Sequence, residues 1–190
     1  ITDSDGRAVS SPVPIGGIGT DGAVSLYHFR IQEVEAPDGY LLDPTVHDFQ
    51  FNIKTDQYQT LTYQYEAADS PNRVIISKKQ LTTKEELPGA SLEVRRVTEM
   101  VDKDGTVIRI DGDVIESWIS TEVPHELECL TEGMYVLIET RAPEGYIEAE
   151  KVYFTISGNM TVDDIPMVEM FDDDTKIEIR KVDSETGNPL

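Results

Sequence analysis

Apolar and polar residues alternate with a period of two along much of the chain. In the run that begins at Tyr27, the first three alternate positions, counted from Tyr27, are apolar. Glu33 continues this set of alternate positions, which we call one parity. In a second run, Glu139 follows Tyr135 and Leu137 on the same parity. This period is typical of a β-strand with one buried face. Each of these strands is therefore expected to end with a glutamate on its buried side.

The same turn signal follows both glutamates. The residues Ala-Pro-x-Gly-Tyr occur at 36–40 and again at 142–146. Proline fixes φ and glycine permits positive φ, so the pair predicts a tight turn. The repeated strand and turn indicate two related units of roughly 100 residues each. Val, Ile, Thr and Tyr are plentiful and long helical periodicity is absent, so the predicted fold class is all-β.

Further charged residues lie where an apolar parity ends. Lys78 and Asp172 each follow two apolar residues of their own parity, and Asp69 ends such a parity in the first unit. Asp69 and Asp172 are 103 positions apart, and Glu33 and Glu139 are 106 apart. The spacings agree apart from one short insertion, so these residues are predicted to be equivalent.

The last residues repeat the opening of the second unit. The stretch 176–183 matches 73–80, and Lys181 lies 103 positions after Lys78. The predicted organisation is a domain without its first strand at 1–72, a complete domain at 73–174, and the first strand of a further domain at 175–190.

A buried lysine beside buried carboxyl groups suggests a particular chemistry. Burial lowers the pKa of an amine and raises that of a carboxyl group, so both can become neutral. A neutral amine is a nucleophile and a neutral acid is an electrophile, and a second carboxyl group can move the proton. The product is a lysine–aspartate amide, formed once with loss of water. The alternative is an ordinary ion cluster in which each lysine reaches past its strand end to pair with glutamate.

The combined motifs resemble a Cna protein B-type domain, the SpaA-type repeat of Gram-positive surface proteins and pilins. They are Val-x-Ile-x-Lys at 74–78, Leu-Pro-Gly-Ala at 87–90, the strand and turn at 135–146, and Val-x-Met-x-Asp at 168–172. The resemblance covers 73–174 from end to end. It implies tandem β-sandwich domains of inverse immunoglobulin topology, each with an intramolecular isopeptide bond between its first and last strands.

The resemblance also implies a role for each charged residue. Lys78 would be the amine, Asp172 the acceptor and Glu139 the catalytic carboxyl group. In the incomplete unit, Asp69 would be the acceptor and Glu33 the catalytic group. Many family members use asparagine and release ammonia, whereas aspartate in both places of this chain implies loss of water.

Lys181 has no acceptor of its own in the third unit. We expect the strand within 176–190 to complete the partial domain of a neighbouring copy, either the next repeat of a longer polypeptide or a separate subunit. A Lys181–Asp69 bond would then link successive units. A bond between Lys181 and Asp69 of the same chain is the alternative.

Net charge limits the choice of partners. The formal charge of -21 over 190 residues argues against nucleic acid and anionic membranes. A self-repelling soluble surface explains this charge, and weak binding of divalent cations is the alternative. We expect no membrane insertion in this segment and, with Cys129 as the single cysteine, no disulfide within the chain. Cys129 is expected to be buried or inert.

No metal or other cofactor is expected. The three histidines lack ligand spacing, and the aspartates at 3–6 and 102–105 are interpreted as hairpin turns rather than calcium loops. The predicted function is a structural stalk or pilus module at the bacterial cell surface, outside the cell, and not a turnover enzyme. An adhesive domain that recognises a host or matrix ligand remains the alternative.

Overall fold

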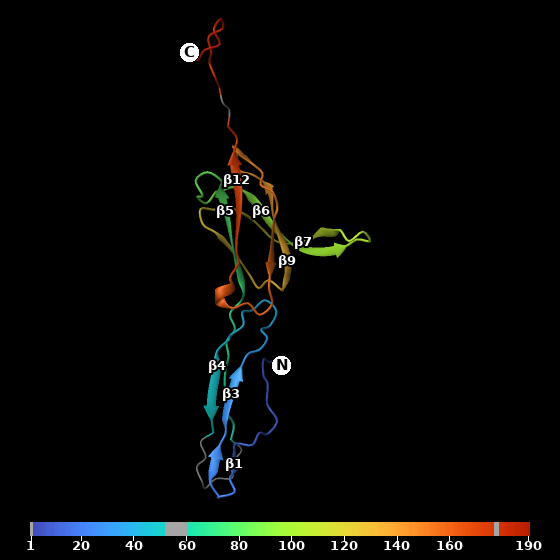
Figure 1. Ribbon diagram of the computed structural model, residues 1–190, viewed down its shortest axis with the longest axis vertical. Helices are drawn as coiled ribbons and strands as arrows, with labels where there is room; N and C mark the ends of the chain where they lie inside the picture. The colour runs from blue at the N-terminus through green and yellow to red at the C-terminus, as the bar shows by residue number, and fades with distance from the viewer. Residues whose placement is uncertain (1, 52–60, 177–178) are drawn as a thin grey trace. The chain divides into compact units, whose positions relative to one another are not determined.

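The computed structural model describes residues 2–51, 61–176 and 179–190, and the chain divides into two compact units (Figure 1). Unit 1 comprises residues 1–35 and 42–69, and unit 2 comprises residues 36–41 and 70–190. The all-β prediction is confirmed, because the described residues contain strands and one short 3-10 turn, η1 (Val162–Asp164). Among them, no helix is long and apolar enough to cross a membrane.

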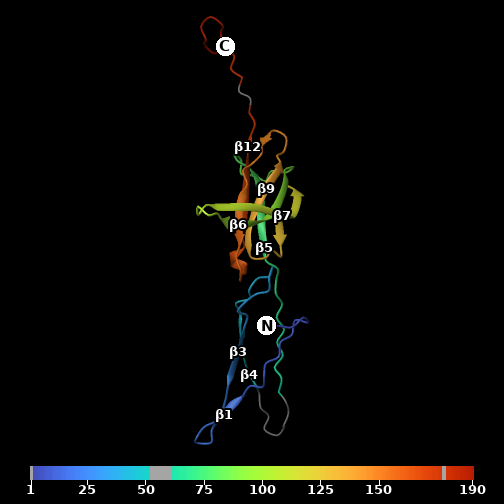
Figure 2. The same ribbon diagram turned by 90° about the vertical axis from the view of Figure 1, so that its right-hand side faces the viewer.

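Unit 2 is a sandwich of two four-stranded sheets, which can be followed in Figure 1 and, after a 90° turn, in Figure 2. The first sheet has the order β10 (Tyr146–Ile147), β12 (Met167–Asp174), β5 (Arg73–Gln80) and β8 (His125–Glu128). The second has the order β11 (Val152–Ile156), β9 (Gly133–Arg141), β6 (Ser91–Val101) and β7 (Val107–Ile119). All neighbours are antiparallel except β5 and β12, which run parallel.

The parallel pair joins the first and last strands of unit 2. Its register places Lys78 opposite Met170, so Lys78 lies close to Asp172 although 94 positions separate them in the chain. In the other sheet, β6 and β9 pair Leu92 with Glu139. The strand order therefore gathers three distant charged residues.

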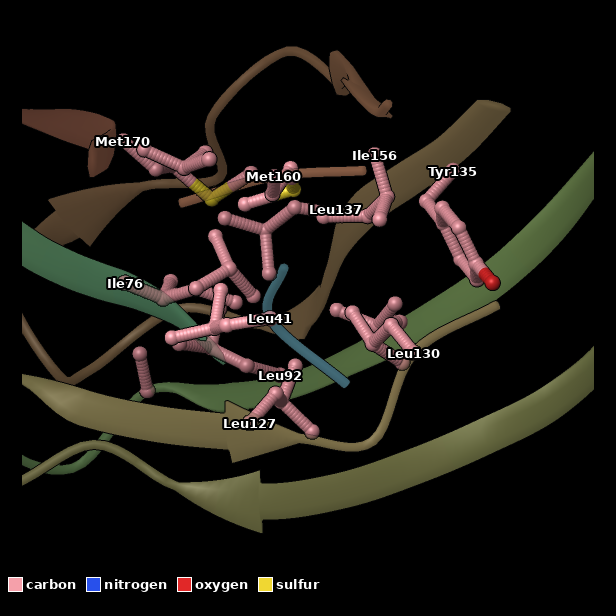
Figure 3. Close-up of a cluster of buried hydrophobic side chains, with 14 residues drawn as sticks. Leu41, Ile76, Leu92, Leu127, Leu130, Tyr135, Leu137, Ile156, Met160 and Met170 are labelled. Carbon is pink, nitrogen blue, oxygen red and sulfur yellow. The ribbon is translucent and has the colours of Figure 1, made fainter. Parts of the chain in front are cut away.

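The core of unit 2 lies between the two sheets (Figure 3). Most of its members are apolar residues at alternating positions on facing strands, and the connections add Leu41, Ala90, Leu130 and Met160. Ile76, Leu92, Leu127 and Leu137 are each no more than 2% exposed. Removal of this apolar surface from water drives the two sheets together.

A buried asparagine closes the end of this core. Asn72 donates from Nδ2 to the carbonyl of Leu130 at 2.7 Å, and its Oδ1 accepts from the N–H of Leu130 at 2.9 Å. Both backbone groups of Leu130 are thus paired away from water. Cys129, the neighbouring residue, is exposed, so the expectation that it is buried is wrong. The reason is that this short connection turns at Cys129 with φ of 57° and directs its side chain outward.

The described part of unit 1 contains four short strands in two antiparallel pairs. They are β1 (Gly16–Ile18) with β2 (Val24–Leu26), and β3 (His28–Gln32) with β4 (Val46–Gln50). Phe29 of β3 stacks on Phe49 of β4 with ring centroids 5.3 Å apart, and Phe49 stacks on Tyr63 at 3.8 Å. The alternation predicted along β3 is therefore present. Phe49, Phe51 and Ile53 also alternate with polar residues and predict a strand, and the part of this pattern at 52–60 lies outside the described residues.

The alternation at 61–69 does not form a strand, contrary to its pattern. The equivalent segment of unit 2 is β12, which is a strand because β5 and β10 pair with it. Within the described residues of unit 1, no strand equivalent to β5 lies beside 61–69. Without a neighbouring strand, the N–H and C=O groups of this segment cannot form the hydrogen bonds of a sheet.

The two predicted turns are alike. The N–H of Tyr40 donates to Pro37 at 3.0 Å, and the N–H of Tyr146 donates to Pro143 at 3.2 Å. Gly39 and Gly145 have φ values of 84° and 88°, a conformation that disfavours other residues. The hairpin turns at Asp3 and Asp102 also share one hydrogen-bond set, in which each Oδ1 accepts from the N–H groups two and four residues later.

Candidate functional site

Three charged side chains meet inside unit 2. Lys78 of β5, Glu139 of β9 and Asp172 of β12 have side chains that are at most 1% exposed. Nζ of Lys78 lies 3.1 Å from Oε1 of Glu139 and donates a hydrogen bond to Oδ1 of Asp172. The structure thus brings one lysine, one glutamate and one aspartate within bonding reach of each other.

The local sequence explains why these side chains point inward. Val74 and Ile76 are buried on β5, and Lys78 continues their face. Val168 and Met170 precede Asp172 in the same way on β12. Alternation along a strand sends every second side chain to one face, so each charged residue enters the core where its apolar run ends.

Glu139 is oriented by the backbone. Its Oε2 accepts a hydrogen bond of 2.7 Å from the N–H of Ala149, in the connection between β10 and β11. Among the described residues, its Oε1 has no hydrogen bond beyond the ion pair with Lys78. The carboxyl group therefore lies between a fixed donor and the amine. The sequence pattern did not reveal this donor, because a main-chain N–H carries no side-chain signal.

Burial changes the acid strength of Asp172. Loss of solvent raises the pKa of Asp172 to about 6, against the opposing attraction of the Lys78 ammonium and with a further raising contribution from Glu139. Within the residues that the structure describes, its Oδ2 has no hydrogen-bond partner, which also disfavours a charged carboxylate. The protonated carboxyl group is therefore accessible close to neutral pH.

The other predicted site residues are less buried than these three. Glu33 is half-buried, whereas Asp69 and Lys181 are exposed. Oε2 of Glu33 nevertheless accepts a hydrogen bond of 2.8 Å from the N–H of Asp43. This donor follows its glutamate by ten positions, as Ala149 follows Glu139. In the part of the chain that the structure describes, no group of three or more His, Cys, Asp or Glu residues could hold a metal ion.

The two-sheet sandwich, with parallel first and last strands around a buried lysine and two acids, defines a prealbumin-like domain. A family model described as the SpaA prealbumin-like fold domain matches residues 72–167, which is half of the chain. The chain belongs to this family.

Several solved structures resemble the chain. The shaft pilin SpaA from Lactobacillus rhamnosus GG is 17% identical, with a TM-score of 0.41 over 88% of this chain and 72% of that chain. A variant of the same pilin is 16% identical, with a TM-score of 0.42 over 88% and 70%. The Bacillus anthracis TIE protein is 21% identical, with a TM-score of 0.39 over 84% and 28%. No curated protein sequence matches the chain.

Proposed function

We propose that this chain is a structural module of a bacterial surface stalk or pilus, in which an amide between Lys78 and Asp172 locks unit 2. The observation that carries the proposal is the buried contact of Lys78 with both Glu139 and Asp172. The reaction occurs once in each molecule, so the protein is not a turnover enzyme. The module acts outside the cell, at its surface.

The geometry supports a direct condensation. The proton of the Lys78 ammonium passes to the Asp172 carboxylate, which gives a neutral amine beside a neutral acid. Nζ then attacks Cγ of Asp172, a C–N bond forms, and a C–O bond breaks as water leaves. Glu139 takes a proton from the amine and returns it to the departing oxygen, so it ends unchanged. The groups are held in place in a core without water, so the reaction needs little reorganisation of solvent and its barrier is lower.

The bond would serve a mechanical role. It joins β5 to β12, so pulling on the ends of unit 2 loads a covalent amide rather than the hydrogen bonds between these strands. By analogy with a disulfide, closing a loop of about 100 residues removes about 4 to 5 kcal/mol of unfolded-state entropy. A stalk whose single cysteine offers no internal disulfide gains the same kind of reinforcement.

In this proposal the segment 176–190 completes the partial unit of a neighbouring repeat or subunit. Its sequence match to β5 supports this role. Adhesion to a host or matrix component would be a separate property of the assembled fibre.

The intact mass under denaturing conditions tests the proposal. We expect a mass one water below the value calculated from the sequence, and an unshifted mass for Lys78→Ala and for Asp172→Ala. Lys79→Ala is the matched control, because Lys79 pairs with Glu169 and should leave the loss of water intact. An unshifted mass for the unaltered chain would overturn the proposal.

A further inference from the structure

Residues 36–41 belong to unit 2, although the chain on either side of them belongs to unit 1. They comprise the first Ala-Pro-x-Gly-Tyr turn and the residue after it, Leu41. Leu41 is 7% exposed and is a member of the unit 2 core. Figure 3 shows its side chain among those of Ile76, Leu92 and Leu127, which lie on β5, β6 and β8. The core of unit 2 therefore contains a residue that the chain supplies from between two segments of unit 1.

Hydrogen bonds hold this turn in place. The N–H of Asn72, the residue before β5, donates to the carbonyl of Gly39 at 2.9 Å. At the start of the turn, the N–H of Ala36 donates to Oδ1 of Asn159 at 3.0 Å. The turn is thus fixed at two points, and Leu41 follows it into the core.

The turn also fits closely against the backbone of unit 2. Gly39 has a φ of 84°, and a Cβ atom at this position would lie 3.2 Å from backbone atoms of Cys129. The N–H of Cys129 donates to the carbonyl of Asn72 at 3.0 Å, so these backbone atoms are themselves held in place. Glycine meets both demands, because it lacks Cβ and adopts positive φ without strain. We call this end of unit 2, formed by Asn72, Cys129, Leu130 and the core residues around Leu41, the socket.

The second turn, at 142–147, has the same backbone but a different environment. The N–H of Thr175 donates to the carbonyl of Gly145 at 2.8 Å, which repeats the bond made at the first turn. A Cβ atom on Gly145 would have nothing within 4 Å, although its φ of 88° is close to that of Gly39. Ile147, the residue after this turn, is 55% exposed. The turn by itself therefore does not bury the residue that follows it, whereas the socket does.

We infer that the Ala-Pro-x-Gly-Tyr turn at 36–40 is a coupling element, in which Leu41 plugs the socket and makes the stability of unit 2 depend on unit 1. The kind of segment that the socket accepts is a turn with a glycine of positive φ and an aliphatic residue two positions later. The inference goes beyond the proposed function. It holds whether or not the amide forms, because no residue of the turn or the socket belongs to the amide site.

The coupling follows from the chain connections. Gln32 of β3 pairs with Val46 of β4, so the turn lies within a short loop that these two strands close. In such a loop, little conformational entropy remains to be lost when Leu41 enters the socket. When unit 1 unfolds, the turn has to dock from a longer flexible chain, which costs more entropy. Unit 2 is therefore more stable while unit 1 is folded.

Denaturant unfolding followed by tryptophan fluorescence tests the plug. Trp118 is the single tryptophan and packs against the unit 2 core, so its fluorescence reports on this unit. Leu41→Ala should raise the unfolding equilibrium constant roughly thirtyfold or more, as at other buried leucines. Ile147→Ala is the matched control and should change the constant by less than about threefold. Equal effects of the two changes would overturn the inference.

The glycines test the close fit. Alanine at either position is strained by the positive φ, but at Gly39 its Cβ also meets backbone atoms. Gly39→Ala should therefore raise the unfolding constant by roughly fivefold or more beyond Gly145→Ala. Asp38→Glu with Leu41→Ile gives the first turn the sequence of the second and should keep the constant within roughly tenfold of the parent. Equal effects of the two glycine changes, or a double variant as unstable as Leu41→Ala, would show that the socket does not recognise this kind of turn.

Hydrogen exchange of single amides under native conditions tests the coupling. Phe49→Ala removes the ring that stacks on Phe29 and Tyr63, and so destabilises unit 1. It should speed exchange of the Asn72 N–H, which is bonded to the turn, by up to roughly a hundredfold, since docking then has to close a longer loop. The Thr175 N–H makes the same bond with the second turn and is the control within the same molecule.

The outcomes of the exchange experiment are distinct. An unchanged rate at Asn72 would show that unit 2 holds the turn without help from unit 1, and would overturn the coupling. An equal increase at Thr175 would overturn it as well, because the change would then be a general loosening of unit 2. None of these measurements follows the amide, so a chain that forms no amide would overturn the proposed function and leave this inference standing.

Discussion

The carboxyl group of Glu139 accepts a hydrogen bond of 2.7 Å from the N–H of Ala149, and its other oxygen lies 3.1 Å from Nζ of Lys78. The glutamate is therefore fixed by a main-chain group that belongs to neither partner of the proposed amide. This arrangement keeps the proton carrier in place while the amine and the acid change their charge. It makes the backbone at Ala149 part of the site.

Ala149→Pro should slow amide formation, because proline has no N–H to donate. A hydrogen bond to a charged group contributes about 1.5 to 3 kcal/mol, so the rate should fall by roughly tenfold to a hundredfold. The measurement is the time course of water loss by intact mass after refolding. Ala149→Gly keeps the N–H and is the control. Equal rates for the two variants would show that the backbone donor does not position Glu139.

Glu139→Gln should abolish the amide and lower the free energy of unfolding. The amide closes a loop over most of unit 2, so its loss should cost about 4 to 5 kcal/mol in denaturant unfolding of that unit. The exposed Glu144 gives a matched control, because Glu144→Gln removes a charge from the following turn without touching the site. A Glu139→Gln chain that still loses water would exclude Glu139 as the proton carrier.

The stability of a chain without the amide should depend on pH through Asp172. In Lys78→Met, the attraction of the ammonium is lost, so the pKa of Asp172 should lie above the value of about 6 that it has beside Lys78. A raised carboxyl pKa stabilises the folded state fully below the unfolded value of 3.8, and this contribution is lost as pH rises through the folded pKa. The variant should therefore lose unfolding free energy between about pH 4 and pH 7.

Asp172→Asn in the Lys78→Met chain isolates that effect. Asparagine does not titrate, so the difference in unfolding free energy between the two chains should grow by on the order of 3 kcal/mol from pH 4 to pH 7. Denaturant unfolding at several pH values measures it. A difference that does not change with pH would mean that Asp172 keeps an ordinary pKa.

The sequence predicted the side chains of the unit 2 site because each of them breaks a simple rule. Lys78, Glu139 and Asp172 lie on buried parities where apolar residues are expected, and the structure buries all three. The alternation could not predict which strands pair. It also could not predict whether a neighbouring strand would be present to pair with a given segment. For this reason 61–69 has the pattern of a strand but does not form one.

The exposure of Asp69 and Lys181 could not be predicted from the alternation for the same reason. Their parity predicts an inward side chain, but a face is buried only when a second layer covers it. Both residues are exposed in this chain. The hydrogen bonds of Ala149 and Asp43 with the two glutamates were also beyond sequence reasoning, since any residue except proline supplies the same N–H.

Asn72 should be a main determinant of unit 2 stability that is independent of the amide. Its side chain pairs with both backbone groups of Leu130, and it is 4% exposed. Asn72→Ala leaves a buried N–H and a buried C=O without partners, at a cost of about 1 to 3 kcal/mol for each group. The measurement is denaturant unfolding in the Lys78→Met chain, so that no covalent bond masks the change. Asn188→Ala, at an exposed position, is the control and should stay within about 0.5 kcal/mol of its parent. If Asn72→Ala also left the free energy of unfolding unchanged, water would have to replace both hydrogen bonds, and this end of the core would be open to solvent.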